Sequence, residues 1–273
     1  MSNRIDQCFA SLKQEKRSAL VTYIAAGDPN PELTVPLLHE LVNSGADMIE
    51  LGVPFSDPMA DGPVIQAACE RALAHGVTMK NVLSMVEQFR RDNQHTPIIL
   101  MGYLNPIEVM GYEIFAKAAK QAGVDGVLSV DLPPEEGEEL LQAFEAAQIA
   151  PIFLISPTTT TERVQLISKV AKGFVYYVSL KGVTGVKTID VAAVQTKLNE
   201  LGQYLNLPIG VGFGIKDPQS AAAVAGVADA VVVGSAIIQQ SQQAGDNRDA
   251  ILSQVSQFVK SLRQAVAQVE KTV

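Results

Sequence analysis

Residues 48–62, MIELGVPFSDPMADG, begin as a short apolar strand and end as a loop broken by proline and glycine. Glu50 lies inside the apolar part, where an unpaired buried carboxylate is costly. It is therefore either satisfied by backbone or a neighbouring arginine, or tuned for general acid/base chemistry. Asp57 and Asp61 follow in the loop, within SDP and ADG sequences that are also ordinary turns. The segment thus predicts a buried strand with carboxylates at its carboxyl end.

The composition of the chain is that of a folded globular enzyme. Its 273 residues suit two modest domains or one large α/β barrel, with 47% hydrophobic and 18% charged residues. A net charge of −8 argues against nucleic acid or an anionic membrane as a partner. No apolar run approaches the roughly 18 residues that span a bilayer. The polar start has no signal-peptide core, so we expect a cytoplasmic protein.

Cysteine and histidine give no sign of a metal or disulfide framework. Cys8 and Cys69 are far apart and outside any CxxC pattern, which predicts buried free thiols. The three histidines have no second ligand at metal spacing. We therefore expect no metal.

Eight apolar runs rich in valine and isoleucine punctuate the chain. Continuous apolar character is typical of parallel strands buried on both faces. The runs are 19–27, 47–55, 97–103, 124–133, 151–157, 173–180, 208–215 and 228–237. Segments with helical spacing lie between them, among them 31–46, 79–93, 106–123, 135–148 and 161–172.

This alternation predicts an α/β fold: one (β/α)8 TIM-barrel domain over residues 1–273. An amphipathic leading helix carries Ile5, Phe9 and Leu12 on one face, and residues 247–270 form a closing helix. Several units share a pattern in which a helix ends in NSGAD, QAGVD or AGVAD and a strand follows. A doubly wound open sheet is the alternative architecture, although AAGDPNP after the first strand lacks the GxGxxG spacing of a dinucleotide loop.

In such a barrel the active site gathers at the carboxyl ends of the strands. The carboxylates there include Asp28, which we interpret as a cap or turn residue, and Asp131, which could orient its loop. Tyr103 at the third strand end could donate a hydrogen bond or simply pack. The last three strand ends offer glycines instead, in GVTG (182–185), GFG (212–214) and Gly234–Ser235.

These glycines predict a phosphate site. Glycine lets an anion approach backbone N–H groups, and a helix N-terminus adds a positive dipole. Thr184 and Ser235 would add hydroxyl donors, with Ser235 opening a short helix. Lys181 and Lys187 flank GVTG and could hold phosphate or be solvated surface charges.

The chain resembles the tryptophan synthase alpha subunit family over essentially its full length. IELGVPFSDPMADGPVIQ (49–66) is similar to that family's signature, and DLPPEE, VSLKGVTG, GVGFGI and VVVGSAII follow in the family's order. The resemblance implies a lyase that splits indole-3-glycerol phosphate by retro-aldol cleavage into indole and glyceraldehyde 3-phosphate, without a cofactor in this subunit. It also implies that Glu50 and Asp61 are the two catalytic carboxylates, and that Asp57 belongs to loop architecture or partner contact.

The resemblance further implies a set of substrate contacts. Indole would be held between apolar side chains and phosphate against the glycines, with Lys181 where relatives often carry arginine. The implied residues are Tyr23, Leu100, Tyr103, Leu128, Thr184, Gly185, Phe213, Gly214, Val232, Gly234 and Ser235.

The implied partner is a β subunit that uses pyridoxal phosphate to join indole to serine in an α2β2 complex. The loop at 54–57 and the loop after the sixth strand would link closure to that partner. Two alternatives remain from sequence: another phosphate-binding barrel of a neighbouring biosynthetic step, and a barrel that serves mainly as an allosteric partner.

Overall fold

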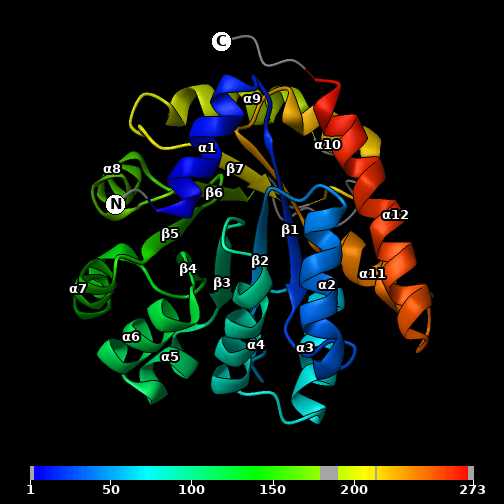
Figure 1. Cartoon of the computed structure of the whole chain (residues 1–273). Helices are drawn as coiled ribbons and strands as arrows, with labels where there is room; N and C mark the ends of the chain where they lie inside the picture. Colours follow the sequence, from blue (N-terminus) through cyan, green and yellow to red (C-terminus); the bar gives the residue numbers. More distant parts are fainter. Residues whose placement is uncertain (1–2, 179–189, 213, 270–273) are drawn as a thin grey trace.

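The computed structural model describes residues 3–178, 190–212 and 214–269. In them, eight parallel strands form a closed barrel, each paired with the next and β8 paired with β1 (Figure 1). Each strand falls on one of the eight apolar runs, with β5 beginning one residue before its run, and closure excludes the open-sheet alternative. The strands are β1 (Ala19–Ala25), β2 (Met48–Gly52), β3 (Ile98–Gly102), β4 (Gly126–Ser129), β5 (Ala150–Ile155), β6 (Val175–Val178), β7 (Ile209–Gly212) and β8 (Ala230–Val233).

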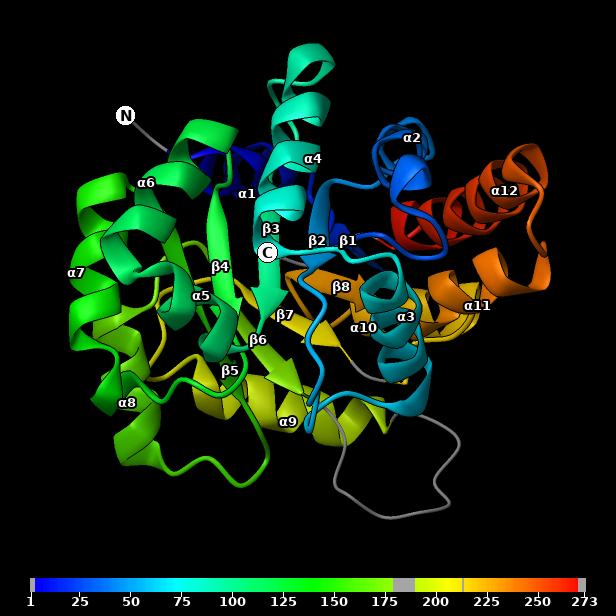
Figure 2. The same ribbon diagram turned by 90° about the horizontal axis from the view of Figure 1, so that it is seen from below.

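Helices surround the barrel (Figure 2). The helical stretch at 106–123 belongs to two helices, because Gly111 adopts φ +89° and ends one helix while starting the next. The helices after α1 are α2 (Pro31–Asn43), α3 (Pro63–Ala74), α4 (Met79–Asp92), α5 (Leu104–Met110), α6 (Tyr112–Ala122), the 3-10 turn η1 (Pro134–Glu136), α7 (Glu138–Ala147), α8 (Thr161–Val170), α9 (Val191–Leu201), α10 (Pro218–Ala225), α11 (Ser235–Gln243) and α12 (Arg248–Ala267).

The expected leading and closing helices are present as α1 (Arg4–Gln14) and α12. Ile5 and Leu12 of α1 are buried against the residues that fill the barrel at the beginnings of its strands. The Phe9 ring packs on Phe174, with centroids 5.9 Å apart. The apolar face of α1 therefore covers the N-terminal end of the barrel.

Strand residues alternate between two apolar layers. In β3, Ile98 and Leu100 pack outward against the helices, whereas Ile99 and Met101 point into the barrel. This two-residue period is the ordinary consequence of strand geometry. It decides which side chain of each strand can reach an interior site.

Three aspartates, which we call the aspartate clips, fasten the N-terminal end of the barrel. Asp47, Asp125 and Asp229 each stand immediately before a strand, namely β2, β4 and β8. Each carboxylate accepts a backbone N–H group at the start of the strand before that one, in β1, β3 and β7 respectively. The donors are Leu20 to Asp47 (2.8 Å), Ile98 to Asp125 (2.9 Å) and Ile209 to Asp229 (2.8 Å). These are the aspartates of the repeated NSGAD, QAGVD and AGVAD patterns, so the repeat has a structural cause.

Arginines neutralise two of the clips. Arg4 and Arg90 both reach Asp125 at 2.8 Å. Arg17 and Arg263 reach Asp47 at 2.8 and 2.9 Å. Buried carboxylates at this end are thus fully paired.

Candidate active site

A partly open cavity of about 260 Å³ lies at the opposite, C-terminal end of the barrel. Its wall is largely apolar, with a few polar groups converging on it, as expected of a small-molecule site. The lining residues are Tyr23, Glu50, Ala60, Asp61, Gly62, Ile65, Met101, Val130, Leu154, Tyr176, Val178, Gly214, Ile215, Val232, Gly234 and Ser235.

Glu50 points into this cavity from the middle of β2. It is 1% exposed, and among the described residues its Oε1 atom has no hydrogen-bond partner. Burial raises the pKa of Glu50 to about 8. Neither backbone nor an arginine satisfies this oxygen, so of the two sequence interpretations the structure favours a carboxyl group tuned for proton transfer.

Asp61 enters the cavity from the loop between β2 and α3. Its Oδ2 atom accepts a hydrogen bond from the Tyr103 hydroxyl at 3.0 Å, and that hydroxyl accepts the Ala60 N–H at 3.0 Å. The Gln66 side chain donates to the Asp61 carbonyl at 2.8 Å. Burial raises the pKa of Asp61, while the Tyr103 hydrogen bond lowers it. The loop therefore holds Asp61 in a fixed, half-buried position.

Two tyrosines flank Glu50 inside the barrel. Tyr23 lies opposite Glu50 in the β1–β2 register, and Tyr176 projects from β6. Each ring lies over a glycine of the next strand, Gly52 and Gly212 respectively, where any side chain would collide with the hydroxyl. Burial raises the pKa of both tyrosines well above 10, so both remain neutral hydrogen-bonding groups.

The far wall of the cavity is suited to an anion. Gly214, with φ +75°, lines it beside Gly234 and Ser235, the last of which begins α11 as expected. No side chain caps the first turn of α11 among the described residues, although the Ile237 N–H donates to the Gly234 carbonyl at 2.8 Å. N–H groups at a helix N-terminus and the helix dipole favour a bound phosphate.

Two sequence-predicted contacts lie elsewhere. Leu100 faces the outer helices, because alternation along β3 turns its neighbour Met101 inward instead. Leu128 points into the barrel beside Met101 in the β3–β4 register and is fully buried with Ile99 and Ile152. Neither Leu100 nor Leu128 is among the residues that line the cavity, and their contact with the substrate stays a prediction.

Other predicted residues have clear places. Tyr103 does not line the cavity but holds Asp61. Asp131 accepts the Leu104 N–H at 2.8 Å and so anchors the start of α5. Asp57 is exposed; its carboxylate accepts the adjacent Ser56 hydroxyl, and its carbonyl accepts the Met59 N–H. Thr184, Gly185, Phe213, Lys181 and Lys187 lie outside the described residues.

Sequence reasoning missed much of the apolar wall and Tyr176. The missed side chains come from β3, the end of β4, β5 and β6, namely Met101, Val130, Leu154, Tyr176 and Val178. The usable signal was the two-residue period: once one inward residue of a strand is known, its neighbours at i±2 also face inward. Tyr176 and Tyr177 are adjacent, however, and sequence alone does not say which one faces inward.

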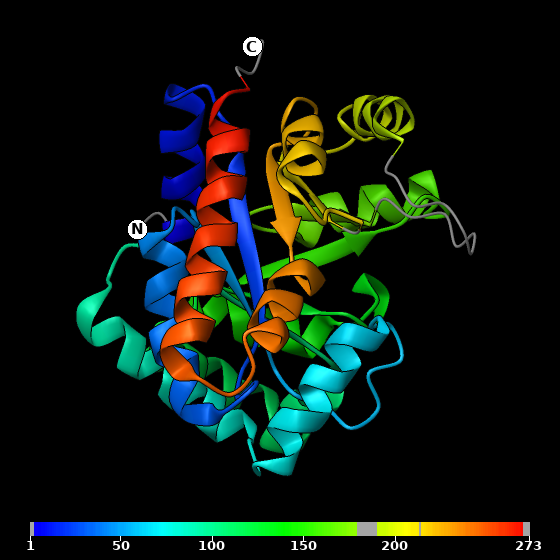
Figure 3. The same cartoon turned by 90° about the vertical axis from the view of Figure 1, so that its right-hand side faces the viewer.

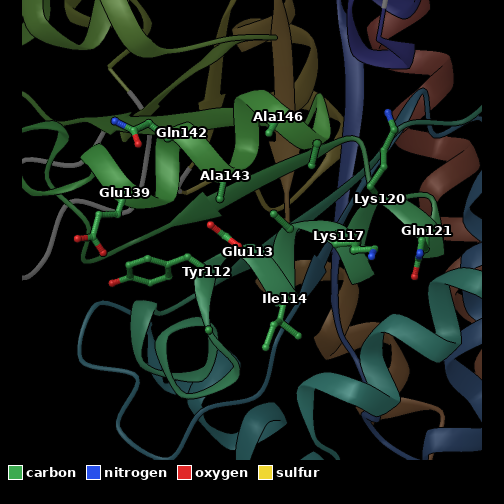
Figure 4. A pocket seen from close by; sticks show the side chains of 13 residues that line it. Tyr112, Glu113, Ile114, Lys117, Lys120, Gln121, Glu139, Gln142, Ala143 and Ala146 are labelled. Atoms are coloured by element: carbon green, nitrogen blue, oxygen red, sulfur yellow. The ribbon is translucent and has the colours of Figure 1, made fainter.

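A wider groove of about 850 Å³ lies outside the barrel between α6 and α7 (Figure 4). Its charged residues, such as Lys117, Lys120 and Glu139, are exposed side chains of the two helices. It contains no buried carboxylate. The acid/base chemistry therefore belongs to the barrel cavity.

Within residues 3–178, 190–212 and 214–269, no group of three or more histidine, cysteine or acidic side chains could hold a metal ion. In the same part of the chain, no helix is long and apolar enough to cross a membrane. Cys69 is buried and Cys8 partly buried, and both thiols are free.

The C-terminal face of this closed barrel carries a desolvated glutamic acid, Glu50, and a second carboxylate, Asp61, that is fixed by hydrogen bonds. This arrangement defines an enzyme that uses acid/base chemistry. Comparisons with known proteins name the family. The chain matches the model of "Tryptophan synthase alpha chain" over residues 9–267 and therefore belongs to the tryptophan synthase alpha chain family.

Individual relatives agree with the family match. The alpha chain from Laribacter hongkongensis (strain HLHK9) is 54% identical over 93% of this chain and 98% of its own length. That from Thioalkalivibrio sulfidiphilus (strain HL-EbGR7) is 54% identical over 97% and 99%. A crystal structure of the alpha subunit from Legionella pneumophila str. Paris has a TM-score of 0.92 and 46% identity, covering 98% of this chain and all of the other.

The family establishes the reaction. The chain is a lyase of tryptophan biosynthesis that cleaves indole-3-glycerol phosphate to indole and glyceraldehyde 3-phosphate, and the indole passes to a β subunit. The expected barrel fold and the expected activity are both confirmed.

Proposed function

We propose that Glu50 and Asp61 carry out this cleavage as a proton-transferring acid and a fixed anion. The observation that carries the proposal is the buried, unpartnered Oε1 atom of Glu50 facing an apolar cavity. A buried carboxylate with a structural role ordinarily has a hydrogen-bond or ion-pair partner. An unpaired carboxyl group that faces a cavity is instead suited to exchange a proton with a bound substrate.

Glu50 acts first as a general acid. With a pKa of about 8 it is protonated at neutral pH and donates that proton to indole C3, which gives the protonated indolenine, a cation that keeps its N–H. The resulting carboxylate then takes the proton of the adjacent side-chain hydroxyl. The C–C bond breaks as that hydroxyl carbon becomes the aldehyde, and its electron pair restores the indole ring. Glu50 ends the reaction protonated, as it began.

Asp61 stabilises the charge on the ring. As an anion it accepts the indole N–H and faces the positive charge that the ring acquires when C3 is protonated. Tyr103 supports this role by holding Oδ2 in place at 3.0 Å. The cavity's low polarity strengthens the ion pairing.

The remaining contacts position the substrate. Tyr23, Val232 and the wall that includes Met101 and Leu154 contact the indole, whereas Gly214, Gly234 and Ser235 hold the phosphate through backbone N–H groups and the Ser235 hydroxyl. Thr184, Gly185 and Phe213 remain proposed contacts on the basis of the family resemblance.

The indole that this chain releases is used by a partner subunit. The alpha chain family implies a β-subunit partner. We infer that the complex is α2β2, that pyridoxal phosphate resides in the β subunit, and that the assembly is cytoplasmic. The uninterrupted barrel supports one domain over residues 1–273.

Indole release by Glu50→Gln tests the catalytic assignment. Removing a general acid costs about 10²–10⁴-fold, so we expect kcat to fall by roughly 10³-fold while the circular dichroism spectrum is unchanged. Asp57→Asn is the matched control in the assay without a β subunit, since Asp57 is an exposed carboxylate in the loop that follows β2, and there it should retain kcat. Assays with and without a β subunit separate an active lyase from a purely allosteric partner. Near-normal turnover by Glu50→Gln would overturn the proton-transfer role.

A further inference from the structure

Arg71 of α3 makes a nearly buried ion pair next to the catalytic face. Its Nε and Nη2 atoms donate to Asp28 Oδ1 and Oδ2 at 2.6 and 3.1 Å. The Asp28 side chain is 4% exposed and lies three residues after Ala25, the end of β1, while Arg71 is 35% exposed. The sequence suggested only a cap or turn for Asp28. The two-point contact instead fixes the angle of α3 against β1.

The other end of α3 carries the proposed anion. Gly62 is the N-cap of α3 and directly follows Asp61, and Gln66 in the first turns donates to the Asp61 carbonyl at 2.8 Å. Arg71 lies about two and a half turns further along the same helix. A rigid helix of this kind transmits a change of angle at Arg71 to the position of Asp61.

The same helix also packs against α11, which begins at Ser235. Ala68 of α3 lies in one apolar cluster with Tyr23 and with Ile238 of α11. Figures 2 and 3 show α3, in cyan, beside α11, in orange.

Gln242 near the end of α11 completes the link. In the amide orientation that satisfies both groups, its side-chain oxygen accepts from Arg71 Nη2 at 2.7 Å and Nη1 at 3.1 Å. Gln242 is exposed, so its hydrogen bonds to Arg71 stabilise the position of α3 less than the hydrogen bonds between Arg71 and Asp28 do. Arg71 thereby joins the end of β1, the helix behind Asp61 and the helix of the phosphate wall.

We propose that Arg71 is a positioning residue of the lyase reaction, which sets the distance between Asp61 and the phosphate wall by fixing α3 to Asp28 and α11. The proposal rests on the roles assigned above to Asp61 and Ser235. One substrate molecule spans both groups, so its phosphate and its indole N–H must be met at the same time.

The expected kinetic effect follows from that geometry. A substrate held by its phosphate and by the apolar wall still binds when α3 tilts, but its N–H then meets a displaced Asp61. A misplacement of about 1 Å can lower a rate by about 10²-fold. Loss of Arg71 should therefore lower kcat more than it raises KM.

The experiment measures kcat and KM for indole release by the full chain carrying Arg71→Met, Arg71→Met with Asp28→Asn, or Arg4→Met. The double variant removes the buried charge that Arg71→Met leaves unpaired, so it separates stability from positioning. Arg4→Met is the matched control: Arg4 is 28% exposed and pairs at 2.8 Å with the buried Asp125 at the opposite end of the barrel.

We expect both Arg71 variants to lose at least tenfold in kcat with KM within about threefold, the double variant to regain thermal stability but not kcat, and Arg4→Met to keep kcat. A double variant with kcat within twofold of wild type would overturn the proposal, as would an equal loss in Arg4→Met. Should neither Arg71→Met protein fold, Arg71→Lys decides the question, because lysine keeps the charge but loses the two-point contact. A threefold or greater loss of kcat supports positioning, and an unchanged kcat contradicts it. Retained activity in Glu50→Gln would instead contradict the acid/base assignment and leave this result standing.

Discussion

Asp125 at the N-terminal end of the barrel is 4% exposed and accepts N–H groups from Arg4, Arg90 and Ile98, whereas Glu50 near the C-terminal end is 1% exposed and its Oε1 accepts none from the described residues. Both are buried carboxyl groups of one barrel. The first is surrounded by donors that favour its anion, and the second by apolar wall that favours its neutral acid.

The buried carboxylate at the N-terminal end of the barrel therefore stabilises the fold, whereas the one at the C-terminal end is available for chemistry. A paired buried carboxylate fastens strands and helices, and removing it leaves uncompensated charge. An unpaired one destabilises the fold but can give and take a proton. The barrel therefore has its aspartate clips at the end where strands start, whereas the end where loops admit substrate holds the unpaired Glu50 besides the Arg71-paired Asp28.

Asp125→Asn tests the stability end and should have the largest effect on folding. It leaves Arg90, whose side chain is 6% exposed, without its carboxylate partner, and breaking a buried pair typically costs about 3–5 kcal/mol. Urea unfolding should show that loss, while kcat of the folded enzyme at 25 °C stays within twofold. A folded Asp125→Asn enzyme with a greatly reduced kcat would break the comparison.

The pH dependence of the free energy of unfolding tests whether Glu50, at the C-terminal end of the barrel, is neutral in the folded protein. The pKa of Glu50 is about 8 in the fold against 4.5 for an ordinary glutamate. Below about pH 4.5 Glu50 is protonated in both states. As the pH rises toward 8 the unfolded chain ionises first, so the free energy of unfolding falls.

Glu50→Gln removes this slope. The variant should be more stable than wild type by on the order of a few kcal/mol at pH 8 and by little near pH 4.5. Unfolding curves of both proteins at several pH values measure the difference. A difference that does not change with pH would mean that Glu50 is ionised in the fold.

Tyr103→Phe sharpens the comparison with a smaller effect. It deletes one hydrogen bond to Asp61, worth about 1.5 kcal/mol to a charged group, so we expect kcat to fall about tenfold with little change in Tm. Because that hydrogen bond lowers the pKa of Asp61, its loss raises the pKa and moves the acidic limb of the pH–rate profile to higher pH. An unmoved limb would show that Tyr103 does not hold the anion.

Sequence patterns were sufficient for the order of strands, whereas the choice of Glu50 and Asp61 as the catalytic pair came from the resemblance to the family and stays a proposal. Apolar runs bounded by glycine and aspartate mark each strand, and Glu50 stands out because its neighbours are apolar. The sequence was insufficient wherever the answer depends on which way a strand faces. Leu100 and Met101 are adjacent and both apolar, so only the register of β3 against β2 shows that Met101 faces the cavity.

Contacts between residues that are distant in sequence could not be predicted from the sequence either. The pairs Asp28–Arg71 and Tyr103–Asp61 join residues 43 and 42 positions apart, and nothing local in the chain marks them. From sequence, Asp28 and Asp61 looked like turn residues, and Tyr103 like a hydrogen-bond donor or a packing residue. Their roles arise only when barrel closure brings the strand ends together.

The aspartate clips also bear on the order in which the barrel assembles. Their hydrogen bonds join residues 27, 27 and 20 positions apart, so each closes a short loop. The bond from Ala19 to the Asp229 carbonyl, which closes the ring, spans nearly the whole chain. Its loop-closure entropy costs about 2 kcal/mol more than that of a clip. The parallel strand pairs β1–β2, β3–β4 and β7–β8 can therefore form first as local β-α-β units, and the seam between β8 and β1 joins last.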